Sequence, residues 1–191
     1  LARIDANCVP LVRDGAHAAV MAAARAHADD TEVVQGACRT LLNLATAADS
    51  RVPLVRDGAH KAVMAAARDH SSDVQVARFV CATLLNLACA DDNVISLVHF
   101  GAHAAVMAAT RAHAGDVQVA RAACGYTTPF AAADGSCAPL VRGGAHTAIM
   151  AAARAHATDV VVVRAACSAL HNLAAAAELQ VSLVSEGAHM A

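Results

Sequence analysis

Apolar positions recur along this chain with a period of 43 residues. Steps of 43 from Leu11 always reach a leucine, and steps of 43 from Gly15 always reach a glycine: Leu54, Leu97, Leu140 and Leu183, and Gly58, Gly101, Gly144 and Gly187. Between these columns apolar residues fall three or four positions apart, which is the spacing of one helix face. The pattern predicts one helical unit that is repeated and stacked on copies of itself.

Each unit resolves into three helices. The first is short, ends at the repeating glycine, and is expected to begin at a polar cap: Asn7, Ser50, Asn93 or Ser136. The second runs from about Ala16 to Ala28 and its counterparts. The third opens at a cap signal, clearest where Ser72 and Gln75 form a capping box, and Asp29 with Glu32 repeats that arrangement.

The third helix of each unit has one broad apolar face and one variable face. In the second unit the face expected to be buried is Val76, Ala77, Val80, Cys81, Leu84, Leu87 and Ala88. The opposite stripe is available to a partner. Its members, unit by unit, are Glu32, Gly36, Arg39 and Asn43; Gln75, Phe79, Ala82 and Asn86; Gln118, Ala122, Gly125 and Pro129; and Val161, Ala165, Ser168 and Asn172.

The period divides the chain into a single array. Residues 1–6 end a preceding unit, four units follow at 7–48, 49–91, 92–134 and 135–177, and residues 178–191 begin a further unit. The third unit departs from the pattern, because residues 124–131 read CGYTTPFA where the second unit reads CATLLNLA. Pro129 inside a helix costs about 3 kcal/mol and Gly125 up to about 1 more. We expect a kinked helix there, with a local reading-frame slip as the alternative.

A short helix, a glycine, a second helix and a longer third helix ending in LLNLA resemble the armadillo repeat over essentially the entire chain. A two-helix HEAT array is the nearest alternative. The resemblance implies an all-α fold, a right-handed α-α superhelix of about four 43-residue three-helix repeats. It also implies that the third helices line a concave groove in which an asparagine of each repeat binds the backbone of an extended peptide. Asn43, Asn86 and Asn172 match that position, and Pro129 does not.

Nuclear-import adaptors of that family carry a tryptophan four residues before the asparagine. This chain has no tryptophan, and Arg39, Ala82, Gly125 and Ser168 occupy the position instead. The difference argues against binding of basic nuclear-localisation peptides.

The repeated asparagines and arginines are the candidate partner-binding residues. Asparagine is not favoured within a helix, so its repetition indicates groove hydrogen bonds or ligand contact, with capping of a neighbouring helix as the alternative. Arginines beside the asparagine stripe would engage carboxylates or phosphates of a ligand. Their alternative is solvation or hydrogen bonding between repeats. The expected site comprises Asn43, Asn86, Asn172, Arg78, Arg121, Arg164, Phe79 and Arg39.

Histidine and cysteine columns do not predict chemistry. Successive histidines in the columns of His17 and His27 are one helix spacing apart, about 8 to 10 Å, which is too far to share a metal ion. The cysteine column of Cys38, Cys81, Cys124 and Cys167 lies on the face expected to be buried. No nucleotide-binding or zinc-protease motif is present. We therefore expect no enzyme activity, cofactor or metal.

Composition narrows the class of partner. The net charge of -2 and the 2% of aromatic residues argue against a general nucleic-acid surface. Stretches free of charged residues, such as 165–177, fall short of the roughly 20 residues that span a membrane. The cysteines are expected to be reduced and the protein intracellular, in the cytoplasm rather than the nucleus.

These observations favour a non-catalytic scaffold that binds an extended peptide or protein segment along the third helices. The alternative is an assembly protein whose terminal repeats, which lack polar caps, associate end to end.

Overall fold

The computed structural model of the chain describes residues 2–132 and 137–175. Every regular element in these two ranges is helical, which confirms the expected all-α class. The α-helices are α1 (Ala2–Arg13), α2 (Ala16–Ala26), α3 (Thr31–Leu44), α4 (Ala48–Arg56), α5 (Ala59–Asp69), α6 (Val74–Ala88), α7 (Asp91–His99), α8 (Ala102–Ala112), α9 (Val117–Tyr126), α10 (Cys137–Arg142), α11 (Ala145–Ala155) and α12 (Val160–Ala175). One 3₁₀ helix, η1 (Thr128–Ala132), follows α9.

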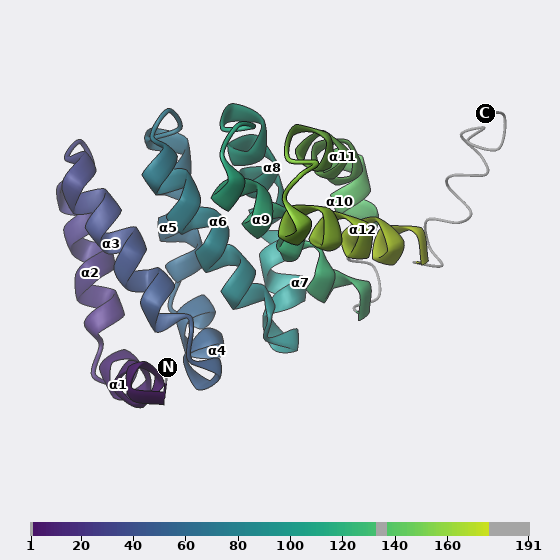
Figure 1. Ribbon diagram of the computed structural model, residues 1–191. Coiled ribbons are helices and arrows are strands. Elements are labelled where there is room, and N and C mark those ends of the chain that lie inside the picture. Colours follow the sequence, from purple (N-terminus) through teal and green to yellow (C-terminus); the bar gives the residue numbers. More distant parts are fainter. Residues whose placement is uncertain (1, 133–136, 176–191) are drawn as a thin grey trace, which may run out of the picture.

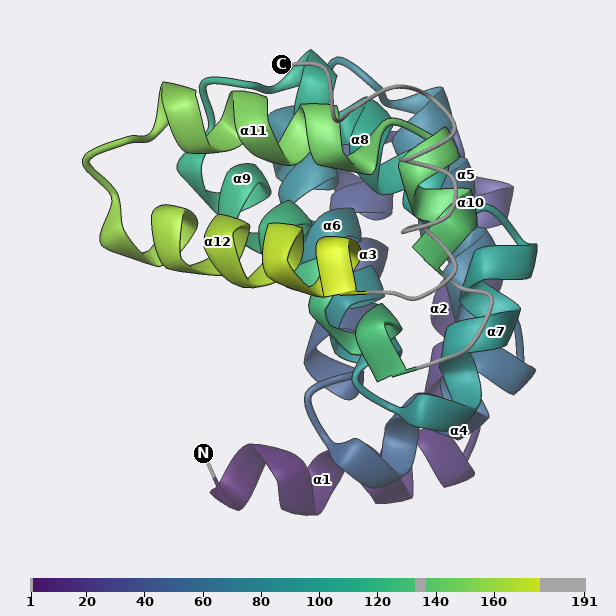
Figure 2. The same ribbon diagram turned by 90° about the vertical axis from the view of Figure 1, so that its right-hand side faces the viewer.

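The helices succeed one another in sets of three, which we call layers 1 to 4. Figure 1 shows α3, α6, α9 and α12 following one another along the molecule, and each of these third helices packs against the next. The second helices α2, α5, α8 and α11 form another row of packed neighbours, and α1, α4 and α7 form part of a third. In Figure 2 the first helices α4, α7 and α10 lie along one side, while α9 and α12 lie on the other.

The core runs through all four layers and is supplied mainly by the third helices. All seven residues expected on the buried face of α6 are 5% exposed or less. Their counterparts Leu41 in α3 and Ala166 in α12 are also buried. Because alanine is short, second helices can approach the third helices closely, and Ala59, Ala102 and Ala145 are fully buried at the start of α5, α8 and α11.

The repeating glycine makes the turn between the first and second helices. Gly15, Gly58, Gly101 and Gly144 all have φ between 75° and 91°, the left-handed region that side chains disfavour. A Cβ at any of the four would meet no atom within 4 Å. The turn therefore requires glycine for its backbone angle and not for space.

The first helices begin earlier than the sequence predicted. Helix α4 starts at Ala48 and α7 at Asp91, so Ser50 and Asn93 lie at the third helical position and do not cap. Asn7 lies well inside α1, and Ser136 is outside the described residues. Asn93 has a different role, since its side-chain amide donates to the carbonyl oxygens of Leu87 and Arg51.

The caps of the third helices are aspartates, one position away from the predicted residues. Asp30, not Asp29, accepts the backbone N–H groups of Glu32 and Val33 at the start of α3. Asp73, not Ser72, accepts the N–H of Val76 at the start of α6. Asp116 and Asp159 repeat this arrangement at α9 and α12.

The helix break expected in the third unit is present. Helix α9 ends at Tyr126, and the chain continues as η1 around Pro129. Proline removes a helical N–H and disfavours the α conformation of the residue before it. Tyr126 and Phe130 fill the space beneath the break, since both are fully buried with ring centroids 4.8 Å apart.

Candidate protein-binding surface on the third helices

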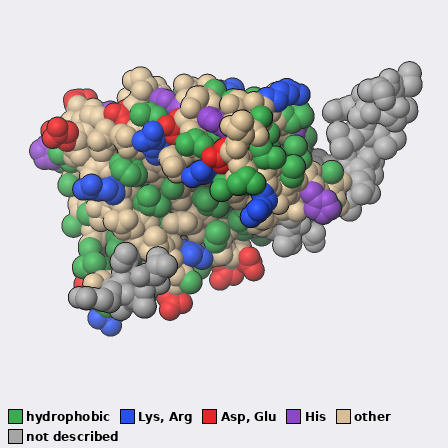
Figure 3. All heavy atoms as spheres, viewed as in Figure 1, with side chains coloured by type: hydrophobic (Ala, Val, Ile, Leu, Met, Phe, Trp, Pro, Cys, Tyr) green, Lys and Arg blue, Asp and Glu red, His purple; other side chains and the backbone are tan. Residues whose placement is uncertain are grey.

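The variable stripe of the third helices forms a surface of mixed character, which we call the third-helix surface. It consists of the sixteen stripe residues identified from the sequence. On α3 the residues Glu32, Arg39 and Asn43 are exposed, and on α6 Phe79 and Asn86 are half-buried. Layer 3 offers fewer exposed side chains to this surface, because Ala122 is buried and Pro129 lies in the 3₁₀ helix. Figure 3 shows basic, acidic and hydrophobic side chains interspersed over one face of the molecule, with neither sign of charge dominant.

A hollow of about 260 Å³ lies between α3 and α6 on this surface. Two of the expected site residues, Arg39 and Phe79, line it together. The other lining residues are Glu32, Gln35, Gly36 and Gln75. Gly36 contributes no side chain to the hollow, and a Cβ at this position would meet no atom within 4 Å.

The three asparagines expected to bind a partner keep their side-chain amides free. Asn43 is exposed, while Asn86 and Asn172 are half-buried. Within residues 2–132 and 137–175 none of the three amides makes a hydrogen bond, so none of them caps a neighbouring helix there. Each amide can both donate and accept, which is the capacity needed to bind a peptide backbone.

Two of the expected arginines are engaged within the protein. The guanidinium of Arg78 binds both carboxylate oxygens of Asp116, with Nε at 3.1 and 3.0 Å. Arg121 binds Asp159 in the same way, with Nη2 at 2.6 Å from Oδ2. Hydrogen bonding to the arginine is the largest cause holding the pKa of each carboxyl below its usual value. The alternative role of hydrogen bonding between repeats therefore holds for Arg78 and Arg121.

Layers 1 and 2 are joined by a hydrogen bond at the same position, but there the partner of the aspartate is an uncharged glutamine. Gln35 donates its side-chain N–H to Asp73 over 3.0 Å. Each aspartate thus caps its own third helix and also binds the preceding third helix. Arg164 is the next member of the column, and it is exposed with no partner among the described residues.

These aspartates were not identified from the sequence as partners of the arginine column. Each lies 38 residues after the side chain that it binds, a separation that is not a multiple of the period. The available signal was an aspartate at the same position of every unit, immediately before the third helix.

Histidines of the second column tie neighbouring layers together. The Nε2–H groups of His70, His113 and His156 donate to the backbone carbonyls of the preceding layer, at 2.7, 2.9 and 3.0 Å. The acceptors are Ala28, Ser71 and Ala114. The structural role expected for these histidines is therefore observed.

Three cysteines of the repeat column are buried and one is not. Burial raises the pKa of Cys38 and Cys81 to about 12 and that of Cys124 to about 11. Cys167 is exposed on α12, contrary to expectation, because no described element packs over it. Only the thiolate is a strong nucleophile, so a raised pKa disfavours reaction of these three buried thiols at neutral pH.

In the part of the chain that the structure describes, no group of three or more histidine, cysteine, aspartate or glutamate side chains could hold a metal ion. Among the same residues no single helix is both long and apolar enough to cross a membrane. Helices α7 and α8 meet the length and composition requirement only together, with a bend of 75° between them.

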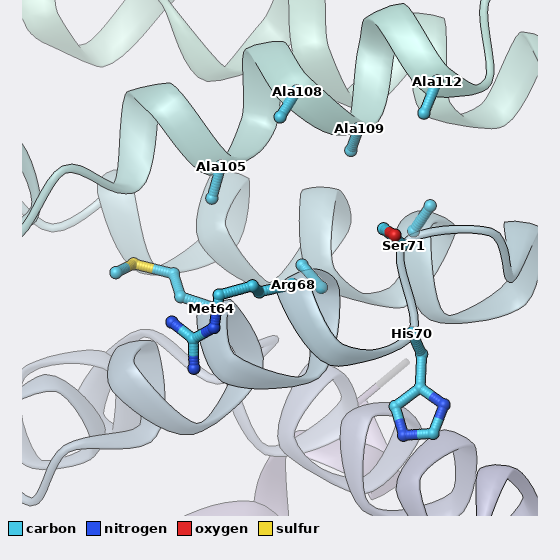
Figure 4. A pocket seen from close by; sticks show the side chains of 10 residues that line it. Met64, Arg68, His70, Ser71, Ala105, Ala108, Ala109 and Ala112 are labelled. Atoms are coloured by element: carbon cyan, nitrogen blue, oxygen red, sulfur yellow. The ribbon is translucent and has the colours of Figure 1, made fainter.

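Alanine-lined slots open between successive second helices, away from the asparagines. Figure 4 shows the slot between α5 and α8, where Ala105, Ala108, Ala109 and Ala112 point toward the helix that carries Met64. Its volume is about 280 Å³, and the slots between α2 and α5 and between α8 and α11 measure about 440 and 180 Å³. The short alanine side chains leave these spaces unfilled.

No protein-family model matches the chain, and no curated protein matches it either.

Proposed function

We propose that this chain is an armadillo-type scaffold that binds an extended peptide or protein segment along the third-helix surface and performs no catalysis. Layers of three helices with a left-handed glycine after each first helix support this assignment. The mixed charge of the surface favours a peptide over a nucleic acid.

The observation that carries the proposal is the set of free amides at one repeat position. Asn43, Asn86 and Asn172 each have donor and acceptor groups that no described residue uses. Neighbouring third helices are about 8 to 10 Å apart, and an extended strand rises about 3.3 Å per residue. Asn43 and Asn86 would therefore contact backbone groups about three residues apart in the bound segment.

Selection from a random-peptide display library, followed by fluorescence polarisation with the enriched peptides, tests the proposal. Replacing Asn43, Asn86 and Asn172 by alanine should weaken binding by roughly tenfold or more, because each lost amide removes hydrogen bonds to the peptide backbone. Asn7→Ala is the matched control, since Asn7 is exposed on α1, outside the third-helix surface. Unchanged binding by the triple variant, with helicity intact, would remove the asparagines from the site.

A second candidate function is end-to-end association of copies, and the links between layers favour it. In three layers the capping aspartate receives a side chain from the preceding third helix. Among the described residues Asp30 and Arg164 hold equivalent positions without that partner. Arg164 of one copy is thus complementary to Asp30 of another.

Sedimentation over a range of protein concentrations tests this association. Arg164→Glu should shift the molecules toward monomer, and adding Asp30→Arg should restore the assembly by reversing both charges. A protein that stays monomeric at the highest soluble concentration contradicts the second candidate.

A further inference from the structure

Gly36 lies in the middle of α3, where glycine lowers the stability of a helix relative to alanine. The residues at the same repeat position in the other third helices are Phe79, Ala122 and Ala165. Gly36 does not have a positive φ, and a Cβ there would meet nothing within 4 Å. Neither the backbone angle nor the internal packing requires a glycine.

Gly36 lies in the wall of the hollow between α3 and α6 and contributes no side chain to it. The hollow's volume of about 260 Å³ lies below the range of roughly 300 to 1,000 Å³ that is usual for small-molecule sites. A cavity of about 150 Å³ already accommodates a benzene ring. The hollow is therefore sized for a single large side chain and not for a cofactor.

The lining determines which side chain fits. Glu32 and Arg39 are exposed at its edge and carry opposite charges, so the hollow has no net preference for a charged occupant. Phe79 packs against the core and is half-buried, so part of its ring forms an aromatic wall. Offset or edge-to-face packing on that ring favours a second aromatic ring.

Two polar side chains of the lining, those of Arg39 and Gln75, also favour an aromatic occupant. Arg39 has no ion pair among the described residues, so its guanidinium is available to stack over an aromatic occupant. The side-chain amide of Gln75 makes no hydrogen bond within the same residues and can accept from an indole N–H or a phenol O–H. Gln35 is not available, because it binds Asp73.

We propose that the hollow between α3 and α6 receives one aromatic side chain of the bound segment, and that Gly36 determines this specificity by leaving the space open. The inference rests on the proposed function, since the aromatic residue belongs to the peptide that the asparagines hold. It adds the chemical identity of one peptide position and names the residue that selects it.

The chain contains no tryptophan, so the fluorescence of N-acetyl-L-tryptophanamide reports its binding without background. N-acetyl-L-leucinamide and N-acetyl-L-lysinamide are the competing probes, and NMR shifts of the Gly36 amide locate the site. We expect the tryptophan amide to bind better than both. Gly36→Leu should weaken its binding by roughly tenfold or more, in line with the cost of extra methylenes in a filled pocket.

Gly36→Ala separates a binding role of Gly36 from a structural one, because the substitution should increase stability while it decreases affinity. It should raise the urea midpoint of unfolding, since alanine favours the helix, and should lower the affinity for the tryptophan amide. Gly115→Ala is the matched control, because a Cβ there also meets nothing within 4 Å but Gly115 lies in the loop before α9. That control should leave binding unchanged.

Peptides from the display selection distinguish this inference from the proposed function. Replacing their shared aromatic residue by alanine should weaken binding about as much as Gly36→Leu does, and the two changes together should not add. If such peptides depend on the asparagines but not on Gly36, the aromatic hollow is wrong and the scaffold stands. If no peptide binds while the tryptophan amide still depends on Gly36, the scaffold is wrong and the hollow stands. Preference for the leucine or lysine amide overturns the aromatic assignment.

Discussion

Replacing Asn93 by alanine should destabilise the protein, because this side chain joins two layers. It is 2% exposed and its Nδ2 donates to the carbonyl of Leu87 at 2.9 Å and to that of Arg51 at 3.1 Å. Leu87 lies in the last turn of α6, where its carbonyl otherwise accepts the backbone N–H of Ala90 over 3.4 Å. Two hydrogen bonds at about 1 kcal/mol each give an expected loss of about 2 kcal/mol.

Ser50 provides a control at the same repeat position in layer 2. It is 1% exposed, and its hydroxyl has no hydrogen-bond partner among the described residues. Removing an unpaired buried hydroxyl abolishes a desolvation cost, so Ser50→Ala should be neutral or stabilise by up to about 1 kcal/mol. Two substitutions at equivalent positions should thus differ in sign.

Urea denaturation followed by helical circular dichroism measures both effects. With a slope of about 2 kcal/mol per molar urea, Asn93→Ala should lower the midpoint by about 1 M. Ser50→Ala should leave the midpoint unchanged or raise it slightly. Equal destabilisation by the two variants would refute the assignment of Asn93 as a link between layers.

Three further measurements follow from the structure. Burial, followed by the charge of Lys61, holds the pKa of His60 below its usual value, so the unfolded chain takes up the proton first. The free energy of unfolding should therefore fall as the pH drops below about 6.5, and His60→Leu should reduce that slope in urea titrations. Cys89 and Cys167 are exposed and should react with a thiol reagent in the native protein. Cys38 and Cys81 are buried with a pKa of about 12 and should react only after unfolding. Mass spectrometry of labelled peptides measures both results. Asp116→Ala removes the cap of α9 and should lower stability by about 1 kcal/mol or more; a midpoint within error of the wild type would contradict the capping role.

The helices and their buried faces could be predicted because both depend on local, periodic features. Apolar spacing places Leu84 and Leu87 on the same face of a helix wherever that helix packs. Gly58 marks a turn because only glycine adopts its backbone angle without strain. The period then repeats both assignments in every unit, so a single correct unit determines the rest.

The contacts between layers could not be predicted, since they depend on how neighbouring helices cross. For Arg78 the sequence left open a ligand contact or a hydrogen bond between repeats, and it did not identify the partner. The offset between α6 and the start of α9 brings the guanidinium to Asp116. Asn93 was expected to cap a helix, but α7 begins two residues earlier and turns the amide toward α6. The repeat period shows which residues hold the same position in different layers. It does not show which residues at different positions come into contact when the layers stack.

Under the proposed function, the break in layer 3 limits where along the array a peptide would bind. Helix α9 ends at Tyr126, and the two buried aromatic rings replace the packing that a continued helix would supply. At the position of the asparagines this layer has Pro129, which has no side-chain hydrogen-bonding group. Asn43 and Asn86 therefore form the only adjacent pair among the described layers, and the hollow beside Gly36 opens between the same two helices. Under the proposed function, layers 1 and 2 would combine backbone and side-chain recognition, so single substitutions there should weaken peptide binding more than Asn172→Ala.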